Sequence, residues 1–173
     1  MLVKYLKELI EFELRLENIK ESFSLKPDVR IKELFVSFDT GGTGYVNPYQ
    51  FKEILQTKLD IYIDNEDIKL LFKKYDRDYD SKLNYPEFCE IFLPKRQEYA
   101  RLIKERITRS GKSISIDSKL ILIKLLISLL EGEKSIEMSR KALANKKLFS
   151  SYDQFDMIKK KYRNFISKED VFE

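Results

Sequence analysis

Oxygen-bearing side chains recur at fixed steps within one short stretch of this 173-residue chain. Between residues 76 and 87 they occupy positions 1, 3, 5, 9 and 12, as Asp76, Asp78, Asp80, Asn84 and Glu87. Apolar residues repeat at helical spacing on both sides of this stretch, in residues 70–75 and 88–92. The pattern predicts two helices joined by a loop whose oxygens converge on one point, and no other segment constrains the fold as tightly.

Such a loop suits a hard cation. Ca²⁺ takes about six to eight oxygen ligands at about 2.3 to 2.6 Å, and a short loop supplies them when carboxylates recur at every second residue. The three aspartates, Asn84, the backbone carbonyl of Lys82 and a bidentate Glu87 meet this demand, so we expect one Ca²⁺ site, with Mg²⁺ as the alternative ion. Ser81 stands at position 6, where the turn needs a positive φ, and a residue other than Gly there costs about 1 kcal/mol. An acidic surface turn between two helices is the simpler alternative.

A second copy of this pattern begins 37 residues upstream and spans residues 39–50. It keeps Asp39 at position 1 and an apolar Val46 at position 8, but Gly41 has no side-chain oxygen at position 3 and Gln50 places a neutral amide at position 12. Because the number of ligand charges is a main determinant of calcium affinity, we expect this loop to bind calcium very weakly or not at all. Its expected role is to pair with the second loop, through Val46 and Leu83.

The two copies resemble the paired helix–loop–helix units, or hands, of the EF-hand superfamily and of calmodulin-like four-hand proteins. Aromatic residues before each loop extend the resemblance: Phe35, Phe38, Phe72 and Tyr75. The segment 92–100 and a series that runs from Glu133 to Phe149 are similar to divergent EF-hand proteins of ciliated protists, which are often axonemal. The resemblance therefore implies a calcium-binding protein in the cytoplasm or in the cytoskeleton of the cilium.

The C-terminal half carries two fainter repeats. A fourth hand is suggested by Phe155, Ile158, Ile166, Asp170 and Phe172, but its ligand positions hold Lys159, Lys161 and Arg163 and cannot bind a cation. An unrelated amphipathic helix followed by a turn is the alternative. A shortened third loop falls at residues 109–117, between an expected helix at 95–108 and the apolar run that begins at Leu120.

The sequence thus predicts an all-α protein with three parts: an N-terminal amphipathic helix (1–25), an EF-hand pair (26–93) and a degenerate EF-hand-like helical lobe (94–173). The first helix has an apolar stripe that packs either on the pair or on a partner, and consists of Leu2, Leu6, Leu9, Phe12, Leu16 and Ile19. The run Leu120–Leu130 is too short to span a bilayer, and we expect it to form a buried helix of the last lobe.

Charge differs between the two halves. Residues 1–93 hold 14 Lys/Arg and 18 Asp/Glu, whereas residues 94–173 hold 19 and 11, which gives net charges of −4 and +8. A basic half suits an acidic protein surface, such as tubulin or another axonemal protein, although a solvated helix face is the plainer interpretation. Nucleic acid is the least favoured partner because the chain contains no recognisable base-reading module.

Composition disfavours an enzyme. The chain has no His, so the usual general base near neutral pH is missing, and no nucleophile lies in a recognisable motif. A single Cys89 argues against disulfides and for a reducing compartment. We expect no signal peptide, because the first helix carries charged residues where a signal peptide has an apolar core.

Two functions remain. One is a dedicated structural or adaptor subunit of a larger assembly, and the alternative is a calcium sensor that captures a helical target. Promiscuous sensors line their grooves with Met, but this chain has only Met1, Met138 and Met157. The scarcity of Met favours the dedicated subunit.

Overall fold

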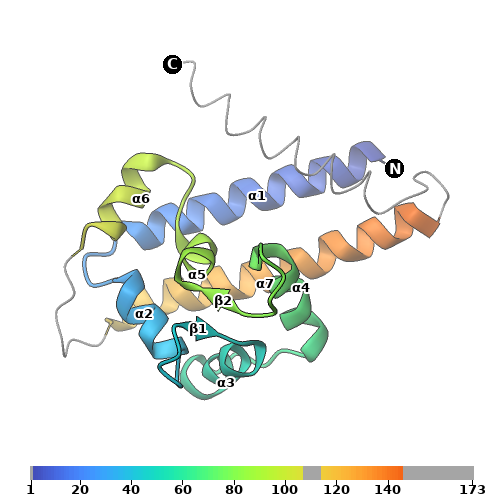
Figure 1. Ribbon diagram of the computed structural model, residues 1–173. Helices are drawn as coiled ribbons and strands as arrows, with labels where there is room; N and C mark the ends of the chain where they lie inside the picture. The colour runs from blue at the N-terminus through green and yellow to red at the C-terminus, as the bar shows by residue number, and fades with distance from the viewer. Residues whose placement is uncertain (1, 107–113, 146–173) are drawn as a thin grey trace. The chain divides into compact units, whose positions relative to one another are not determined.

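The computed structural model describes residues 2–106 and 114–145, and these form helices with one very small sheet (Figure 1). The all-α prediction, including its N-terminal helix, is confirmed. In chain order the elements are α1 (Leu2–Ser24), α2 (Ile31–Phe38), β1 (Tyr45–Val46), α3 (Pro48–Leu59), α4 (Asn65–Tyr75), β2 (Leu83–Asn84), α5 (Tyr85–Phe92), α6 (Gln97–Lys104) and α7 (Ile116–Asn145).

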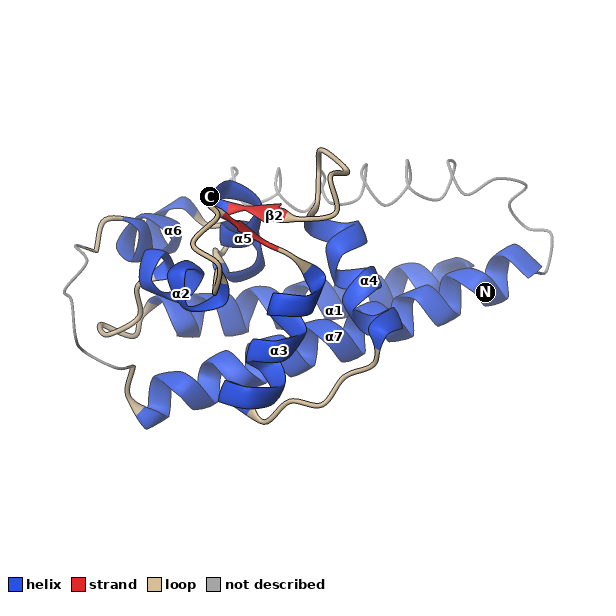
Figure 2. Ribbon diagram, turned by 60° about the horizontal axis from the view of Figure 1, so that its bottom comes forward, coloured by secondary structure: helices blue, strands red, loops and turns tan. Residues whose placement is uncertain are grey.

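The two predicted loops pair as the sequence indicates. β1 and β2 run antiparallel, with Tyr45 opposite Asn84 and Val46 opposite Leu83 (Figure 2). Both apolar residues at loop position 8 are fully buried. The prediction that Val46 and Leu83 join the two helix–loop–helix units is therefore confirmed.

The helix that follows each loop begins at a capping box. In the second unit the side chain of Asn84 accepts a hydrogen bond from the backbone N–H of Glu87, whose side chain accepts one in return from the N–H of Asn84. Asn47 and Gln50 form the same reciprocal pair in the first unit, and each helix has Pro in its first turn. The residues at loop positions 9 and 12 therefore have two roles, because they end the loop and also cap the first turn of the helix that follows.

Aromatic side chains from both helix–loop–helix segments form one core. Phe38 lies 4.9 Å from Phe51 and 5.3 Å from Phe88, and Phe88 lies 5.0 Å from Phe92, measured between ring centroids. Edge-on and tilted contacts of this kind are favourable beyond the area that they bury. Because Phe38 belongs to the first helix–loop–helix and Phe88 to the second, the two share this aromatic core.

The chain divides into two compact units, one of residues 12–134 and the other of residues 1–11 with 135–173. The larger unit contains the paired loops and the apolar part of α7, whose buried residues are Leu122, Leu125, Leu126, Leu129 and Leu130. The sequence placed this apolar run in a separate C-terminal lobe. The boundaries at residues 25 and 93 stay predictions.

Within the larger unit, α1 and α7 approach closely at a glycine. A Cβ atom built on Gly132 would lie 1.9 Å from Cε2 of Phe12, a separation that real atoms do not reach. Phe12 is itself buried. Gly132 is therefore required by contact with Phe12 and not by helix propensity, which disfavours Gly in a helix interior.

The smaller unit has its own buried residues on the described parts of α1 and α7. They include Tyr5, Leu9, Ile136 and Leu143. The hydroxyl of Ser139 donates to a carboxylate oxygen of Glu8 at 2.9 Å and joins the two helices.

The helix expected at residues 95–108 is shorter, since α6 covers only Gln97–Lys104. Arg106 lies beyond its end and donates to the backbone carbonyls of Ser24, at 2.6 Å, and Val29, at 3.0 Å. The last carbonyls of a helix have no partner within it, and Arg106 satisfies one of those of α1.

The proposed fourth hand, residues 107–108 of the expected helix and residues 109–113 of the shortened third loop lie outside the described residues. In the part that is described, no helix is long and apolar enough to cross a membrane.

Candidate metal centre

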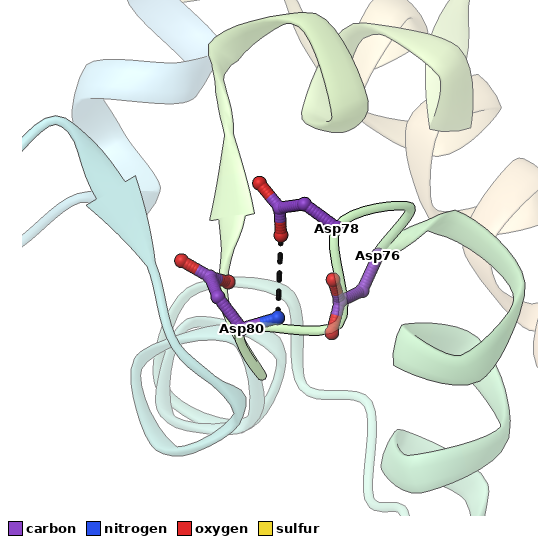
Figure 3. Close-up of side chains that lie close together, drawn as sticks. All are labelled: Asp76, Asp78 and Asp80. Atoms are coloured by element: carbon purple, nitrogen blue, oxygen red, sulfur yellow. Dashed lines mark hydrogen bonds between the residues drawn. The ribbon is translucent and has the colours of Figure 1, made fainter.

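Three carboxylates converge in the loop between α4 and α5. Asp76, Asp78 and Asp80 each present an oxygen, and these atoms all lie within 4.8 Å of one another (Figure 3). The backbone N–H of Asp80 donates to Oδ1 of Asp78 at 3.2 Å, and that of Lys82 donates to Oδ1 of Asp80 at 2.8 Å. These short-range bonds hold the two exposed carboxylates in place within the loop.

Glu87 connects the two ends of the same loop. Its Oε1 accepts a hydrogen bond from the N–H of Arg77 at 2.8 Å, and its Oε2 accepts one from the N–H of Asn84 at 3.0 Å. The side chain is 4% exposed. A carboxylate at position 12 is thus held against the start of the loop, as the predicted ligand role requires.

Asp76 has an unsatisfied oxygen. Its Oδ2 accepts from the N–H of Ser81 at 2.9 Å, but its buried Oδ1 has no hydrogen-bond partner among the described residues. Asp76 is only 9% exposed, and a buried oxygen without a partner costs about 1 to 3 kcal/mol. A cation bound among the aspartates would satisfy this atom, so the residues present fit a divalent ion.

The backbone of the loop is strained at two residues. Ser81 has a φ of 65° and Tyr79 a φ of 62°, both in the left-handed region. Ser81 therefore adopts the positive φ that the sequence requires at position 6. The first loop has Gly42 and Gly44 at the equivalent positions, where this conformation carries no steric cost.

The first loop is closed by its own hydrogen bonds. Oδ1 of Asp39 accepts from the N–H of Thr43 at 3.0 Å, and Oδ2 accepts from the N–H of Gly44 at 2.7 Å. Burial of the Asp39 carboxylate by itself would raise its pKa, but these hydrogen-bond donors outweigh that effect, and the pKa of Asp39 is lowered. The amide Nε2 of Gln50 donates to Oγ1 of Thr40 at 3.2 Å, so position 12 offers a donor to the loop where a metal site needs an acceptor.

A buried ionic cluster lies beside the second loop and was not anticipated from the sequence. Lys74, two residues before Asp76, forms ion pairs with Glu13 of α1, at 3.2 Å, and with Glu133 of α7. Lys20 of α1 is buried nearby and donates to the backbone carbonyl of Glu90. The sequence does contain an indication of this cluster, since Glu13 and Lys20 lie at helical spacing among the apolar residues of α1 that face the core.

Lys20 predicts a pH dependence of stability. Burial, together with the nearby Lys74 ammonium, lowers the pKa of Lys20 from 10.5 to about 7. Between these values the unfolded chain binds more protons than the folded one, so stability should rise with pH, by at most about 1.4 kcal/mol per pH unit for one proton. We expect this rise in urea unfolding between about pH 7 and 8.5, and its loss in Lys20→Met.

The pH range stops at about 8.5 because the Cys89 thiol would add its own effect on stability at higher pH. Burial raises the pKa of Cys89 above 9.0, and a raised acid group lowers stability as pH increases through the ordinary value. An equal slope in the wild type and in Lys20→Met would assign the pH dependence to other groups.

Comparison with known proteins agrees with this geometry over part of the chain. A family model described as an EF-hand domain pair matches residues 28–93, from the connection between α1 and α2 to the residue after α5. No curated protein matches the chain.

Proposed function

We propose that the protein binds one calcium ion in the loop Asp76–Glu87 and acts as a dedicated structural or adaptor subunit, since residues 28–93 match a family model described as an EF-hand domain pair. The family match supports a calcium-binding protein, and the site and the role are our proposals. The observation that carries the site is the buried, unpartnered Oδ1 of Asp76 among three converging carboxylates.

The ligand set would consist of oxygens from six residues: Asp76, Asp78, Asp80, Lys82 through its backbone carbonyl, Asn84 and Glu87. Four carboxylates and flexible coordination suit Ca²⁺, whereas Mg²⁺ demands near-octahedral geometry at about 2.0 to 2.1 Å. The strain at Ser81 and the lack of charge in the first loop favour an affinity in or below the sensor range of about 10⁻⁷ to 10⁻⁵ M.

The structural role is supported by how the apolar surface of the hand pair is covered. A sensor exposes a groove on binding calcium and captures a target helix there. Here Phe23 of α1 contacts Phe92 of α5, with ring centroids 6.2 Å apart. α7 is tied to the second hand by the Lys74–Glu133 and Asp67–Lys134 ion pairs, and its leucines are buried in the same compact unit. The chain's own helices therefore occupy surface that a sensor would offer to a target.

We further propose which assembly the subunit belongs to. The resemblance to protist proteins suggests the ciliary axoneme, and the +8 balance of residues 94–173 suggests an acidic partner surface such as tubulin.

A pull-down from ciliary extract tests this role. We expect association to survive chelation of calcium and to weaken with salt, since exposed charges are screened beyond about 10 Å at 0.1 M ionic strength. Capture that needed calcium and ignored salt would favour the sensor.

A further inference from the structure

We propose that residues 12–24 of α1, here called the brace segment, fix the angle between α4 and α5, so that calcium binding does not open the second hand. The inference rests on the proposed calcium site, and it goes further by assigning what controls the conformational response of that site. Three sets of contacts support it.

The brace segment holds the end of α4, the helix that leads into the loop. Glu13 forms an ion pair with Lys74 at 3.2 Å, and the Lys74 ammonium lies 5.0 Å from the ring centroid of Phe12. The Lys20 amine lies 5.9 Å from the ring centroid of Tyr75. Lys74 and Tyr75 are the last two residues of α4, immediately before Asp76.

The same segment holds the end of α5, the helix that leaves the loop. The Lys20 amine donates to the backbone carbonyl of Glu90 at 2.7 Å. That carbonyl is one of the last four of α5, which lack partners within the helix, so Lys20 acts as a cap supplied by another helix. Phe23 packs on Phe92 at the same end.

Further contacts continue past the end of α5. A carboxylate oxygen of Glu17 accepts a hydrogen bond from the N–H of Lys95, and Glu21 forms an ion pair with Arg96 at 3.5 Å. Glu13, which pairs with Lys74 on the α4 side, also forms an ion pair with Lys95 at 3.5 Å. The brace segment therefore contacts the chain from Glu90 to Arg96 through five of its own side chains.

These contacts restrict one particular motion. In sensor hands the angle between the two helices changes from about 130–140° to about 90–100° when calcium binds. Here the ends of both helices are attached to a single continuous helix. The hand can open only if one set of contacts breaks. On the α5 side this would remove the hydrogen bonds that Lys20 and Glu17 make to backbone groups, together with the ion pairs of Glu21 with Arg96 and of Glu13 with Lys95.

Spin-label distances test the proposal. We would place labels at two exposed positions in a Cys89→Ser background. One is Lys73→Cys on α4, and the other is Gln97→Cys at the first residue of α6, which follows the short connection after α5. We expect one narrow distance distribution that is the same with and without calcium. In the Glu17→Met/Lys20→Met variant, which keeps side-chain bulk but removes the two hydrogen bonds to backbone groups, we expect a second population above about 10% that grows with calcium.

Arg15→Met, on an exposed position of the same helix, is the matched control and should behave like the background protein. Circular dichroism checks that each variant is folded. A calcium-dependent shift in the background protein, or an unchanged distribution in the folded double variant, would overturn the proposal.

Calorimetry on the same samples separates this proposal from the calcium site. If no calcium binds, the proposed function fails, and the brace is then judged on the metal-free distributions alone. A broadened distribution in the double variant supports the brace, and a distribution identical to that of the background refutes it.

Discussion

Replacing Glu87 by Gln is expected to abolish calcium binding measured by titration calorimetry. The change removes one of four carboxylates and the bidentate ligand at position 12 while keeping size and shape. We expect the Kd to rise at least about 100-fold, which corresponds to about 2.7 kcal/mol. In the wild type the same titration should give one site per chain.

Thermal unfolding gives an independent measurement of the same effect. A ligand at about 100 times its Kd stabilises the folded state by about 2.7 kcal/mol, which raises the Tm of a protein of this size by about 5 to 10 °C. This rise should be lost in Glu87→Gln.

The first loop offers a matched control. Gln50→Glu makes the reverse exchange at the equivalent position, and it should add at most weak binding because Gly41 still supplies no side-chain oxygen. Two tight sites in the wild type, or a Glu87→Gln protein that binds normally, would refute the assignment of the site.

The second large effect is expected at the contact between α1 and α7. Gly132→Leu places a side chain where the buried ring of Phe12 lies, and overpacking of this kind typically costs about 1 to 3 kcal/mol or more. The better helix propensity of Leu recovers up to about 1 kcal/mol. We expect a net loss of about 2 kcal/mol and a Tm lower by about 4 to 8 °C, measured by calorimetry.

A double-mutant cycle distinguishes a clash from a general effect of Leu. Phe12→Ala alone should cost about 3 to 5 kcal/mol, but Gly132→Leu should be much less harmful in that background because the new side chain can fill the space left by the ring. Glu131→Leu, at the exposed neighbouring position, should change stability little. Additive losses in the cycle would show that Phe12 is not the cause.

The sequence was most informative where local spacing determines local structure. The ligand pattern from Asp76 to Glu87 placed the loop, and the repeat 37 residues upstream placed its partner, including the Val46–Leu83 pair. Such features depend on residues that are close in the chain, so no tertiary information was needed. The convergence of Asp76, Asp78 and Asp80 follows from the same short-range geometry.

The contacts of α1 and α7 could not be predicted in the same way. Lys74 is 61 residues from Glu13 and 59 from Glu133, and nothing in the local pattern pairs them. The apolar stripe of α1 indicated a buried face but left open whether the chain or a partner covers it. In the structure Phe12, Leu16 and Ile19 are buried within this chain.

The hydrogen bonds of the first loop have a consequence for how calcium is read out. In paired sites, cooperativity arises when filling one loop organises the other. The loop Asp39–Gln50 is already organised by its own donors, with Asp39 bound to Thr43 and Gly44 and with Gln50 bound to Thr40 and Asn47. If the second loop is the one that binds calcium, as we propose, filling it should follow a simple one-site isotherm, with a Hill coefficient of one, and spread over about two decades of calcium concentration. Calcium occupancy of this subunit would then change gradually and not as a threshold switch.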